Sequence, residues 1–281
     1  MMLPLQESLN QLAKDFSGHF ALYAEHLETG EAISFGAPHP METASTIKLP
    51  ILIAAMKKVQ DGSLSLDQPV TLLEEDQVSG SGVLQNLTLG IALPLADVLM
   101  LMIIVSDNMA TNMVLRLVGL QTVNQLMASL GAKDTVIKKA IDFSLPPPIG
   151  LSTPQDLVHL LKGIYRRELV SKEASEWMWD VLTRQQYNTI LTRRLPYALL
   201  DSDDDQPPLV VIGSKSGSVE GVRNDAGIVQ TPWGDYAIAI MSEGCQDLRF
   251  HIDNEAHRLL PLAARAILEH FAPQALATEE S

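Results

Sequence analysis

Strand-like segments lie at both ends of this chain and enclose a long helical middle, and this arrangement most restricts the fold. Near the N-terminus, residues 19–27 and 31–35 have the pattern of two strands with a glycine-containing turn between them. Toward the C-terminus, apolar strand patterns cover residues 209–217, 222–230 and 236–242. Because a sheet needs several strands for stability, we expect these segments to form one antiparallel sheet completed from both ends of the chain.

The middle of the chain has the pattern of helices. One helix is expected to begin near Ser45 and to end at Asp61-Gly62, and another covers residues 96–105. A third begins after Asn108. A further helix start is predicted by Thr153-Pro154, since threonine caps helix N-termini and proline is tolerated in the first turn.

These patterns predict two domains. A short amphipathic helix over residues 5–16 and a closing helix over residues 255–271 are expected to flank the sheet. The α/β domain is then discontinuous and consists of residues 1–37 plus 188–281. The helical middle, residues 38–187, is expected to be an all-α domain inserted into it.

Composition excludes several classes of function. The chain has 34 acidic and 20 basic residues, which gives a net charge of −14. This charge argues against nucleic acid or an anionic membrane as the main partner, because both need a positive surface. A single cysteine, Cys245, excludes an internal disulfide framework and cysteine-cluster metal sites.

Targeting and membrane segments are not expected. The most apolar stretch, residues 87–105, is interrupted by Gly90, Pro94 and Asp97, so a buried core helix is favoured over a membrane span. The first residues have no basic region followed by an apolar region, so no secretory signal is predicted. We expect a cytoplasmic protein, or a periplasmic or secreted one if a leader has been removed.

Ser45 and Lys48 stand three residues apart at the expected start of a helix. That spacing puts a hydroxyl and an amine on one helix face, close enough for the amine to take the hydroxyl proton. Backbone N–H groups at a helix N-terminus also face developing negative charge. Taken alone, the pair fits an N-capping serine and a surface lysine equally well.

Ser106-Asp107-Asn108 follows the most apolar helix. In a functional interpretation, Ser106 relays a proton between an amine and a leaving group. Asn108 then donates an amide hydrogen bond to the substrate. In the alternative interpretation, the three residues form a turn and the cap of the next helix.

Lys215-Ser216-Gly217 ends an apolar strand. The lysine offers positive charge, the serine a hydroxyl, and the glycine lets the backbone approach a ligand closely. The alternative is an ordinary strand end.

The three motifs occur in this order, each in the kind of element that its chemistry requires. Together they resemble the penicillin-recognising serine enzymes, nearest to the class A β-lactamases. The segment from Gly221 to Ile228 also looks like members of that family. The resemblance covers nearly the whole chain and implies the β-lactamase/DD-peptidase-like fold, α/β plus all-α. This fold has a five-stranded antiparallel sheet, flanking helices and an inserted helical domain, with the site between the domains.

Carried over residue by residue, the resemblance implies a role for each motif. Ser45 is the acylated nucleophile and Lys48 its proton acceptor. Ser106 passes a proton to the leaving atom, and Asn108 holds the substrate amide. Lys215 and the adjacent Ser216 meet the substrate carboxylate.

The resemblance also assigns a role to the backbone after the third motif. The N–H groups of Ser45 and Ser218, the residue after Gly217, form the oxyanion hole. Arg223 lies just beyond the hairpin turn and is expected to help Lys215 anchor a carboxylate, since a guanidinium binds a carboxylate bidentately. The alternative is a strand arginine paired with Glu220 or Asp225.

One departure from the family pattern concerns deacylation. Class A β-lactamases carry a glutamate in a Glu-x-x-Leu-Asn pattern on the Ω-loop, where it activates the deacylating water. The interval between Asn108 and Thr153 contains no glutamate, and its acids are Asp134 and Asp142. Asp142 is the better substitute by position, although it fits a strand or loop segment equally well. We therefore expect acylation by β-lactams to be faster than deacylation.

Two classes of function stay open. The first is a serine hydrolase acting on β-lactams, with an esterase or a D-alanyl-D-alanine carboxypeptidase-like enzyme as the alternative. The second is a catalytically silent penicillin-binding module. The presence of both Lys48 and Ser106 favours the hydrolase, because a pure binder has no need for both.

A metal or nucleotide enzyme has little support. The sequence has no phosphate-binding loop and no helix-facing histidine pair at metal-ligand spacing, so neither metal nor cofactor is expected. His251 and His257 are expected to be surface residues. The expected partners are small-molecule substrates of a monomer.

Overall fold

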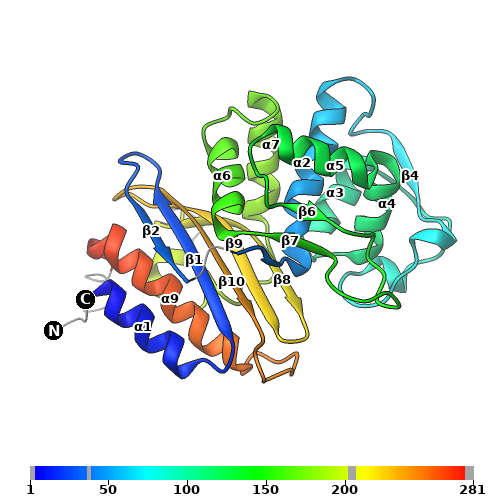
Figure 1. Cartoon of the computed structure of the whole chain (residues 1–281). Helices are drawn as coiled ribbons and strands as arrows, with labels where there is room; N and C mark the ends of the chain where they lie inside the picture. Colours follow the sequence, from blue (N-terminus) through cyan, green and yellow to red (C-terminus); the bar gives the residue numbers. More distant parts are fainter. Residues whose placement is uncertain (1–3, 37–38, 202–206, 276–281) are drawn as a thin grey trace.

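The central sheet has five antiparallel strands in the order β2-β1-β10-β9-β8 (Figure 1). The computed structural model describes residues 4–36, 39–201 and 207–275. The expectation that both ends of the chain supply one sheet is confirmed. The strands are β1 (His19–His26), β2 (Ala32–Phe35), β8 (Val211–Val219), β9 (Val222–Gln230) and β10 (Tyr236–Glu243).

Helices cover both faces of the sheet, so the central strands alternate between two hydrophobic cores. α1 (Leu5–Asp15) and α9 (Glu255–Phe271) pack on one face, where they share a core with Ile238 and Ile240 of β10. Ala239, which points to the opposite face, belongs to the core of the helical part. Side chains of a strand alternate between faces, and this explains why β10 is almost continuously buried.

The helical part is built around α2 (Lys48–Gln60). Residues 48–56 of this helix are all buried, as is typical of a helix that is surrounded on every side. The remaining helices are α3 (Leu95–Ile104), α4 (Asn108–Val118), α5 (Leu120–Ser129), α6 (Pro154–Tyr165), α7 (Lys172–Thr183) and α8 (Tyr197–Leu200). The short strands are β3 (Met41–Glu42), β4 (Pro69–Thr71), β5 (Ala92–Pro94), β6 (Val136–Ile137) and β7 (Gly150–Ser152).

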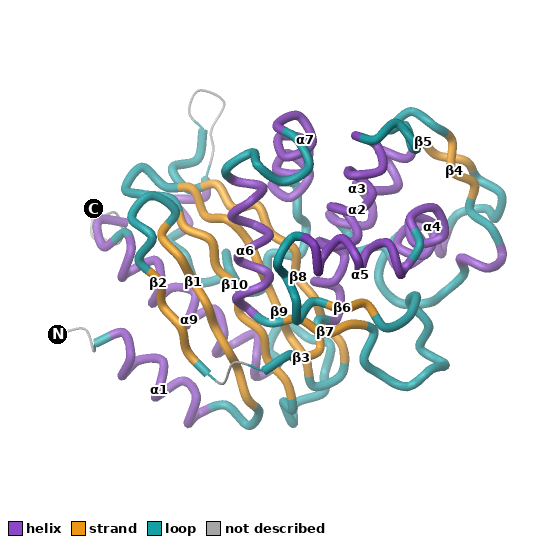
Figure 2. The backbone as a smooth tube through the Cα atoms, turned by 45° about the horizontal axis from the view of Figure 1, so that its top comes forward, coloured by secondary structure: helices purple, strands orange, loops and turns teal. Residues whose placement is uncertain are grey.

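α6 connects the two parts of the molecule. It contacts β1, β9 and β10, and α7 contacts β8 (Figure 2). The Thr153 side chain caps α6 by accepting a hydrogen bond of 3.1 Å from the Asp156 amide, as the sequence predicted. The boundary expected at residues 37–38 lies outside the described residues, and the division into two domains stays a prediction.

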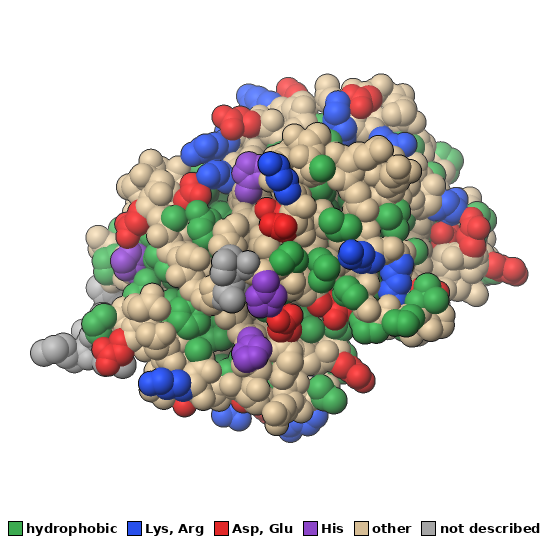
Figure 3. Space-filling model, in the orientation of Figure 1, with side chains coloured by type: hydrophobic (Ala, Val, Ile, Leu, Met, Phe, Trp, Pro, Cys, Tyr) green, Lys and Arg blue, Asp and Glu red, His purple; other side chains and the backbone are tan. Residues whose placement is uncertain are grey.

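Of the apolar stretch, residues 87–105, only the second half is the expected buried helix; residues 87–94 form a turn and strand β5, with Leu87 and Leu89 exposed. α3 has ten residues, and five of them are fully covered by the helical core. In the described part of the chain, no helix has the length and apolar character needed to cross a membrane. On the face drawn in Figure 3, acidic and basic side chains are interspersed.

Candidate active site

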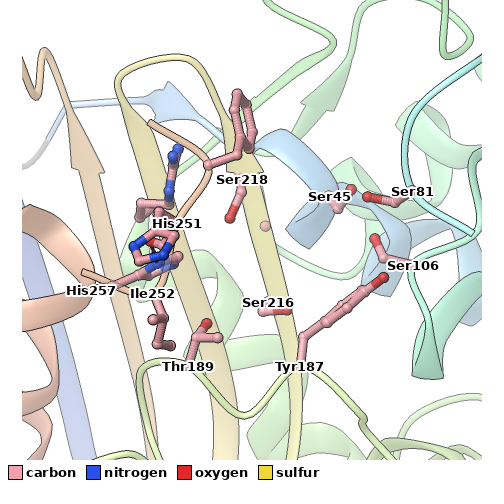
Figure 4. A pocket seen from close by; sticks show the side chains of 13 residues that line it. Ser45, Ser81, Ser106, Tyr187, Thr189, Ser216, Ser218, His251, Ile252 and His257 are labelled. Carbon is pink, nitrogen blue, oxygen red and sulfur yellow. Dashed lines mark hydrogen bonds between the residues drawn. The ribbon is translucent and has the colours of Figure 1, made fainter. Parts of the chain in front are cut away.

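The three sequence motifs meet at a cavity of about 360 Å³ between β8 and the helical part (Figure 4). Its walls come from segments that are far apart in the sequence. The lining residues are Ser45, Ser81, Ser106, Tyr187, Thr189, Ser216, Gly217, Ser218, Arg223, Phe250, His251, Ile252 and His257.

Ser45 lies in a 3-10 turn, Ala44–Ile47, directly before α2 rather than in the first turn of an α-helix. The helix expected to begin near Ser45 is present, but its first turn is 3-10 and the α-helix begins only at Lys48. Ala44 has a φ of 45°, a left-handed conformation that costs a non-glycine residue about 1–3 kcal/mol. The turn half-buries Ser45 and presents it to the cavity.

Gly217 lets β8 lie directly against this turn. A Cβ atom at Gly217 would stand 2.8 Å from the backbone nitrogens of Ser45 and Thr46 and from the carbonyl oxygen of Thr43. Only a residue without a side chain permits this approach. The contact brings Ser218, the next residue of β8, to the same cavity as Ser45.

Lys48 is fully buried beneath Ser106 and Asn108. Its Nζ lies 2.7 Å from the carbonyl oxygen of Ser106, 2.8 Å from Oδ1 of Asn108 and 3.1 Å from the Ser106 hydroxyl. Burial holds the pKa of Lys48 well below its usual range, and the nearby charge of Lys215 lowers this pKa further. A neutral amine has two hydrogens, which the two carbonyl oxygens accept, and its lone pair remains for a hydroxyl proton.

Ser106 is held in a strained position. Its φ is 51°, and its carbonyl accepts the bond from Lys48. The carboxylate of the next residue, Asp107, accepts hydrogen bonds from the amides of Val83, Leu84 and Ala110. Asp107 therefore caps α4 and also ties the loop that carries Ser81 to the Ser106 wall of the cavity. The sequence predicted only the cap.

Asn108 uses both ends of its amide within the protein. Oδ1 accepts from Lys48, and Nδ2 donates to the carbonyl of Ser79 at 3.0 Å. Asn108 is 4% exposed and is not among the residues that line the cavity. One hydrogen of Nδ2 is not used in these bonds.

Lys215 precedes Ser216 in β8, and the register of β8 and β9 places Ala226 opposite Lys215 and Asp225 opposite Ser216. The Lys215 amine is fully buried and donates to the carbonyl of Ser216 at 2.6 Å. Burial lowers the pKa of Lys215 to about 7, although Asp225 acts in the opposite direction. Burial raises the pKa of Asp225 to about 6. Lys215 thus lies behind the wall formed by Ser216, Gly217 and Ser218, and its charge changes near neutral pH.

Arg223 is buried on the cavity, but most of its guanidinium is already used. Nη1 donates to the carbonyls of Val219 and Val222, and Nη2 donates to the carbonyl of Arg249 at 2.8 Å. The Phe250 ring lies 4.7 Å from the guanidinium carbon. Arg223 therefore cannot bind a carboxylate bidentately through both terminal nitrogens. Among the described residues, Arg223 forms no hydrogen bond or ion pair with the side chain of Glu220 or Asp225.

Asp142 does not reach this cavity. Its carboxylate accepts hydrogen bonds from the amide and hydroxyl of Ser144, at 2.8 and 2.6 Å. These bonds lower the pKa of Asp142, so they stabilise the charged form. Among the described residues, Asp142 lines a separate cavity with Asp76 and Arg116. The structure thus brings together Ser45, Lys48, Ser106, Ser216 and Ser218 and leaves Asp142 apart.

Some lining residues were not found from the sequence. Phe250, His251 and Ile252 come from the loop before α9, and His257 comes from the first turn of that helix. The expectation that His257 is a surface residue is wrong, because it is 8% exposed. Tyr187 and Thr189 follow α7. No local pattern marks these segments, because only the path of the chain brings them to the cavity.

The fold and this cluster define a serine hydrolase of the penicillin-recognising type. Residues 4–271 match the model of a protein family described as "Beta-lactamase enzyme family". The chain belongs to this family.

Individual relatives are distant but cover nearly the whole chain. A protein named beta-lactamase from Rhodobacter capsulatus is 24% identical over 273 residues, which cover 94% of this chain and 88% of the relative. The crystal structure of a beta-lactamase from Sphaerobacter thermophilus is 29% identical, with a TM-score of 0.85 and coverage of 96% and 99%. A variant of PBP-A, solved as an acyl-enzyme with penicillin G, is 27% identical, with a TM-score of 0.83 and coverage of 96% of each chain.

Proposed function

We propose that this protein hydrolyses β-lactams through an acyl-enzyme on Ser45. The observation that carries the proposal is the fully buried Lys48 amine, which Ser106 and Asn108 hold beside the cavity that Ser45 lines. Two of the relatives are named beta-lactamase, and the PBP-A variant carries penicillin on the enzyme. These findings support a serine acyl-enzyme in preference to a silent binding module.

The proposed acylation uses groups of this chain only. The neutral Lys48 amine takes the proton of the Ser45 hydroxyl as its oxygen bonds to the lactam carbonyl carbon. The carbonyl oxygen, now negative, accepts hydrogen bonds from the backbone N–H groups of Ser45 and Ser218. When the carbon–nitrogen bond breaks, Ser106 gives its proton to the lactam nitrogen and receives one from the Lys48 ammonium.

The remaining motif residues are proposed to position the substrate. Lys215 supplies positive charge from behind the wall, and the hydroxyls of Ser216 and Ser218 meet the substrate carboxylate directly. Arg223 adds its charge to the cavity through Nε, which has no hydrogen-bond partner in the described part of the chain. The free hydrogen of Asn108 Nδ2 is the proposed donor to the substrate amide.

Deacylation is proposed to be slow. The loop between β6 and β7 contains no glutamate, and the carboxylate of Asp142 is bound to Ser144. General-base help is worth about 10²–10⁴ in rate, so its absence leaves the acyl-enzyme to accumulate.

Intact-mass spectrometry after mixing with benzylpenicillin tests this proposal. We expect one adduct, on Ser45, that persists long after acylation is complete. Ser45→Ala should form none and keep its fold, because losing a half-buried hydroxyl changes little packing. Rapid multiple turnover without an adduct would contradict slow deacylation, and an adduct mapped to Ser106 would contradict the assignment of the nucleophile.

Ester hydrolysis is a second candidate, favoured by apolar side chains beside the site. At least half of the surface of Phe143, Leu145 and Phe250 is exposed. These three side chains line a further cavity, which shares Phe250 with the cavity at Ser45. In Figure 3, hydrophobic side chains gather at the lower right, where Figure 1 draws the β6–β7 loop. Turnover of short-chain and long-chain nitrophenyl esters, compared with a chromogenic β-lactam and a D-alanyl-D-alanine peptide, would rank the substrate classes.

The substrate class also predicts the compartment. β-Lactams and cell-wall peptides lie outside the cytoplasm, whereas an ester substrate fits the cytoplasmic expectation. Cell fractionation therefore tests the substrate class independently: a protein outside the cytoplasm supports β-lactams or cell-wall peptides, and a cytoplasmic protein supports an ester.

A further inference from the structure

The wall of the cavity opposite Ser45 and Ser106 contains a histidine with one unsatisfied nitrogen (Figure 4). Nδ1 of His257 lies 3.2 Å from the carbonyl oxygen of His251, so Nδ1 carries the hydrogen and donates it. The neutral ring then has a lone pair on Nε2. Nε2 is buried and has no hydrogen-bond partner among the described residues.

Arg223 supplies a second unsatisfied nitrogen on the same cavity. Its Nε is buried and without a partner in the described part of the chain, while Nη1 and Nη2 bind backbone carbonyls. Buried polar atoms without a hydrogen-bond partner are rare in folded proteins, so two such atoms on residues of one cavity are a specific arrangement. His257 lies at the end of the cavity remote from Ser106 (Figure 4), and Arg223 lines the same cavity.

The groups around His257 are mainly positive. Arg223 faces it from β9, and Arg193 donates to the His257 carbonyl at 2.7 Å. His251 and Asp253 lie on the preceding loop. Asp253 is exposed and lies 3.9 Å from Arg193 and 3.5 Å from His251. Burial and the two arginines lower the pKa of His257, so it is neutral in the empty site at pH 7.

We propose that His257 is a proton-dependent binding group for the substrate carboxylate, acting together with Nε of Arg223. This inference rests on the proposed β-lactam function. A carboxylate that enters this end of the cavity needs a hydrogen-bond donor. His257 takes up one proton from solvent on Nε2, and the resulting N–H donates a hydrogen bond to a carboxylate oxygen. The bound anion offsets the positive charges of Arg223 and Arg193, so binding and proton uptake favour each other. Carboxylate substrates therefore bind more tightly as pH falls.

The test measures the rate of acylation by benzylpenicillin and by its methyl ester between pH 5.5 and 8. At each pH the substrate concentration is raised to saturation, which separates the binding constant from the acylation rate constant. His257→Asn keeps a donor to the His251 carbonyl and removes Nε2. His257→Gln places a non-titrating amide near the Nε2 position. Lys215 also titrates in this range, but it is present in all three proteins, so the ratio to wild type reports His257 alone.

We expect wild type to bind benzylpenicillin more tightly at low pH, and the ratio of its affinity to that of His257→Asn should grow by at most about tenfold per pH unit, the limit for the one proton on His257. The dependence should be weaker in both variants, and binding at pH 5.5 should fall about threefold or more in His257→Asn. The methyl ester should bind equally to all three.

Several results would overturn the inference. One is a pH dependence of binding that is unchanged in both variants. Another is the same loss for the methyl ester, which would indicate a merely structural role. A third is a pH dependence that disappears in His251→Asn but not in His257→Asn. If wild type forms no adduct with benzylpenicillin at all, the proposed function itself has failed, and this outcome is distinct from the others.

Discussion

Gly217→Ala is the substitution for which the structure gives the most direct prediction. The new Cβ atom would stand 2.8 Å from the nitrogens of Ser45 and Thr46 and from the carbonyl oxygen of Thr43. All three neighbours are backbone atoms, so no rotation of a side chain relieves the contact. Strand β8 and the Ala44–Ile47 turn must therefore move apart.

The size of this movement follows from the contact distances. Ordinary contacts of a Cβ atom begin at 3.4 Å, so the gap must open by about 0.6 Å. The turn carries the N–H of Ser45 and the strand carries that of Ser218, and oxyanion donors must lie about 2.7–3.1 Å from the oxygen that they stabilise. Loss of one such donor costs about 10²–10³ in rate, or about 2.7–4 kcal/mol. We expect acylation by benzylpenicillin to slow about 100-fold.

The assay is the acylation rate from intact mass over time, alongside a thermal unfolding curve. Gly163→Ala is the matched control. The three atoms nearest to its Cβ all belong to the flexible Leu169 side chain, the closest at 3.0 Å. Gly163 lies inside α6, where alanine is favoured over glycine by about 1 kcal/mol. The control should acylate at the wild-type rate. A Gly217→Ala protein that stays folded and acylates within about threefold of wild type would refute the reasoning.

Three further predictions concern Lys48, Lys215 and Asp142. Lys48→Arg should form no adduct, because a guanidinium does not lose its proton to become a base, and an adduct at the wild-type rate would contradict the role of the amine. For a carboxylate substrate, kcat/KM should rise with pH as Lys48 becomes neutral and fall above about pH 7 as Lys215 loses its proton, whereas a neutral ester should lack the falling limb. Asp142→Asn should leave the lifetime of the acyl-enzyme unchanged, because its carboxylate binds Ser144 and lies outside the cavity, and a longer lifetime would make Asp142 the missing base.

Strand and helix patterns predicted most of the elements correctly, for reasons that are local. The closing strands and the last helix were expected within two residues of their observed bounds, since two-residue alternation and helical caps depend on neighbouring residues. The 3-10 turn at Ser45 was missed. Gly217 of β8 packs against this turn from a distant part of the chain, and no pattern near Ser45 indicates that contact.

The assignment of roles at the site divides in the same way. Ser45, Lys48 and Ser106 were chosen because their types and spacing match a known chemistry, and the structure brings Lys48 within 3.1 Å of the Ser106 hydroxyl. Arg223 and Asp142 were chosen by position alone. The Arg223 guanidinium donates to backbone carbonyls, and the Asp142 carboxylate accepts a hydrogen bond from Ser144. No sequence pattern indicates either partner.

The sequence by itself therefore determined the family, the order of the elements and the residue types that can form an acyl-enzyme. Only the tertiary structure decided which of these groups are buried and which are already hydrogen-bonded. Burial sets the charge of Lys48, Lys215 and His257, because desolvation depends on every segment packed around a side chain. The loop before α9 reaches the cavity for the same reason: long-range packing places it there, and its own residues carry no local pattern that predicts the contact.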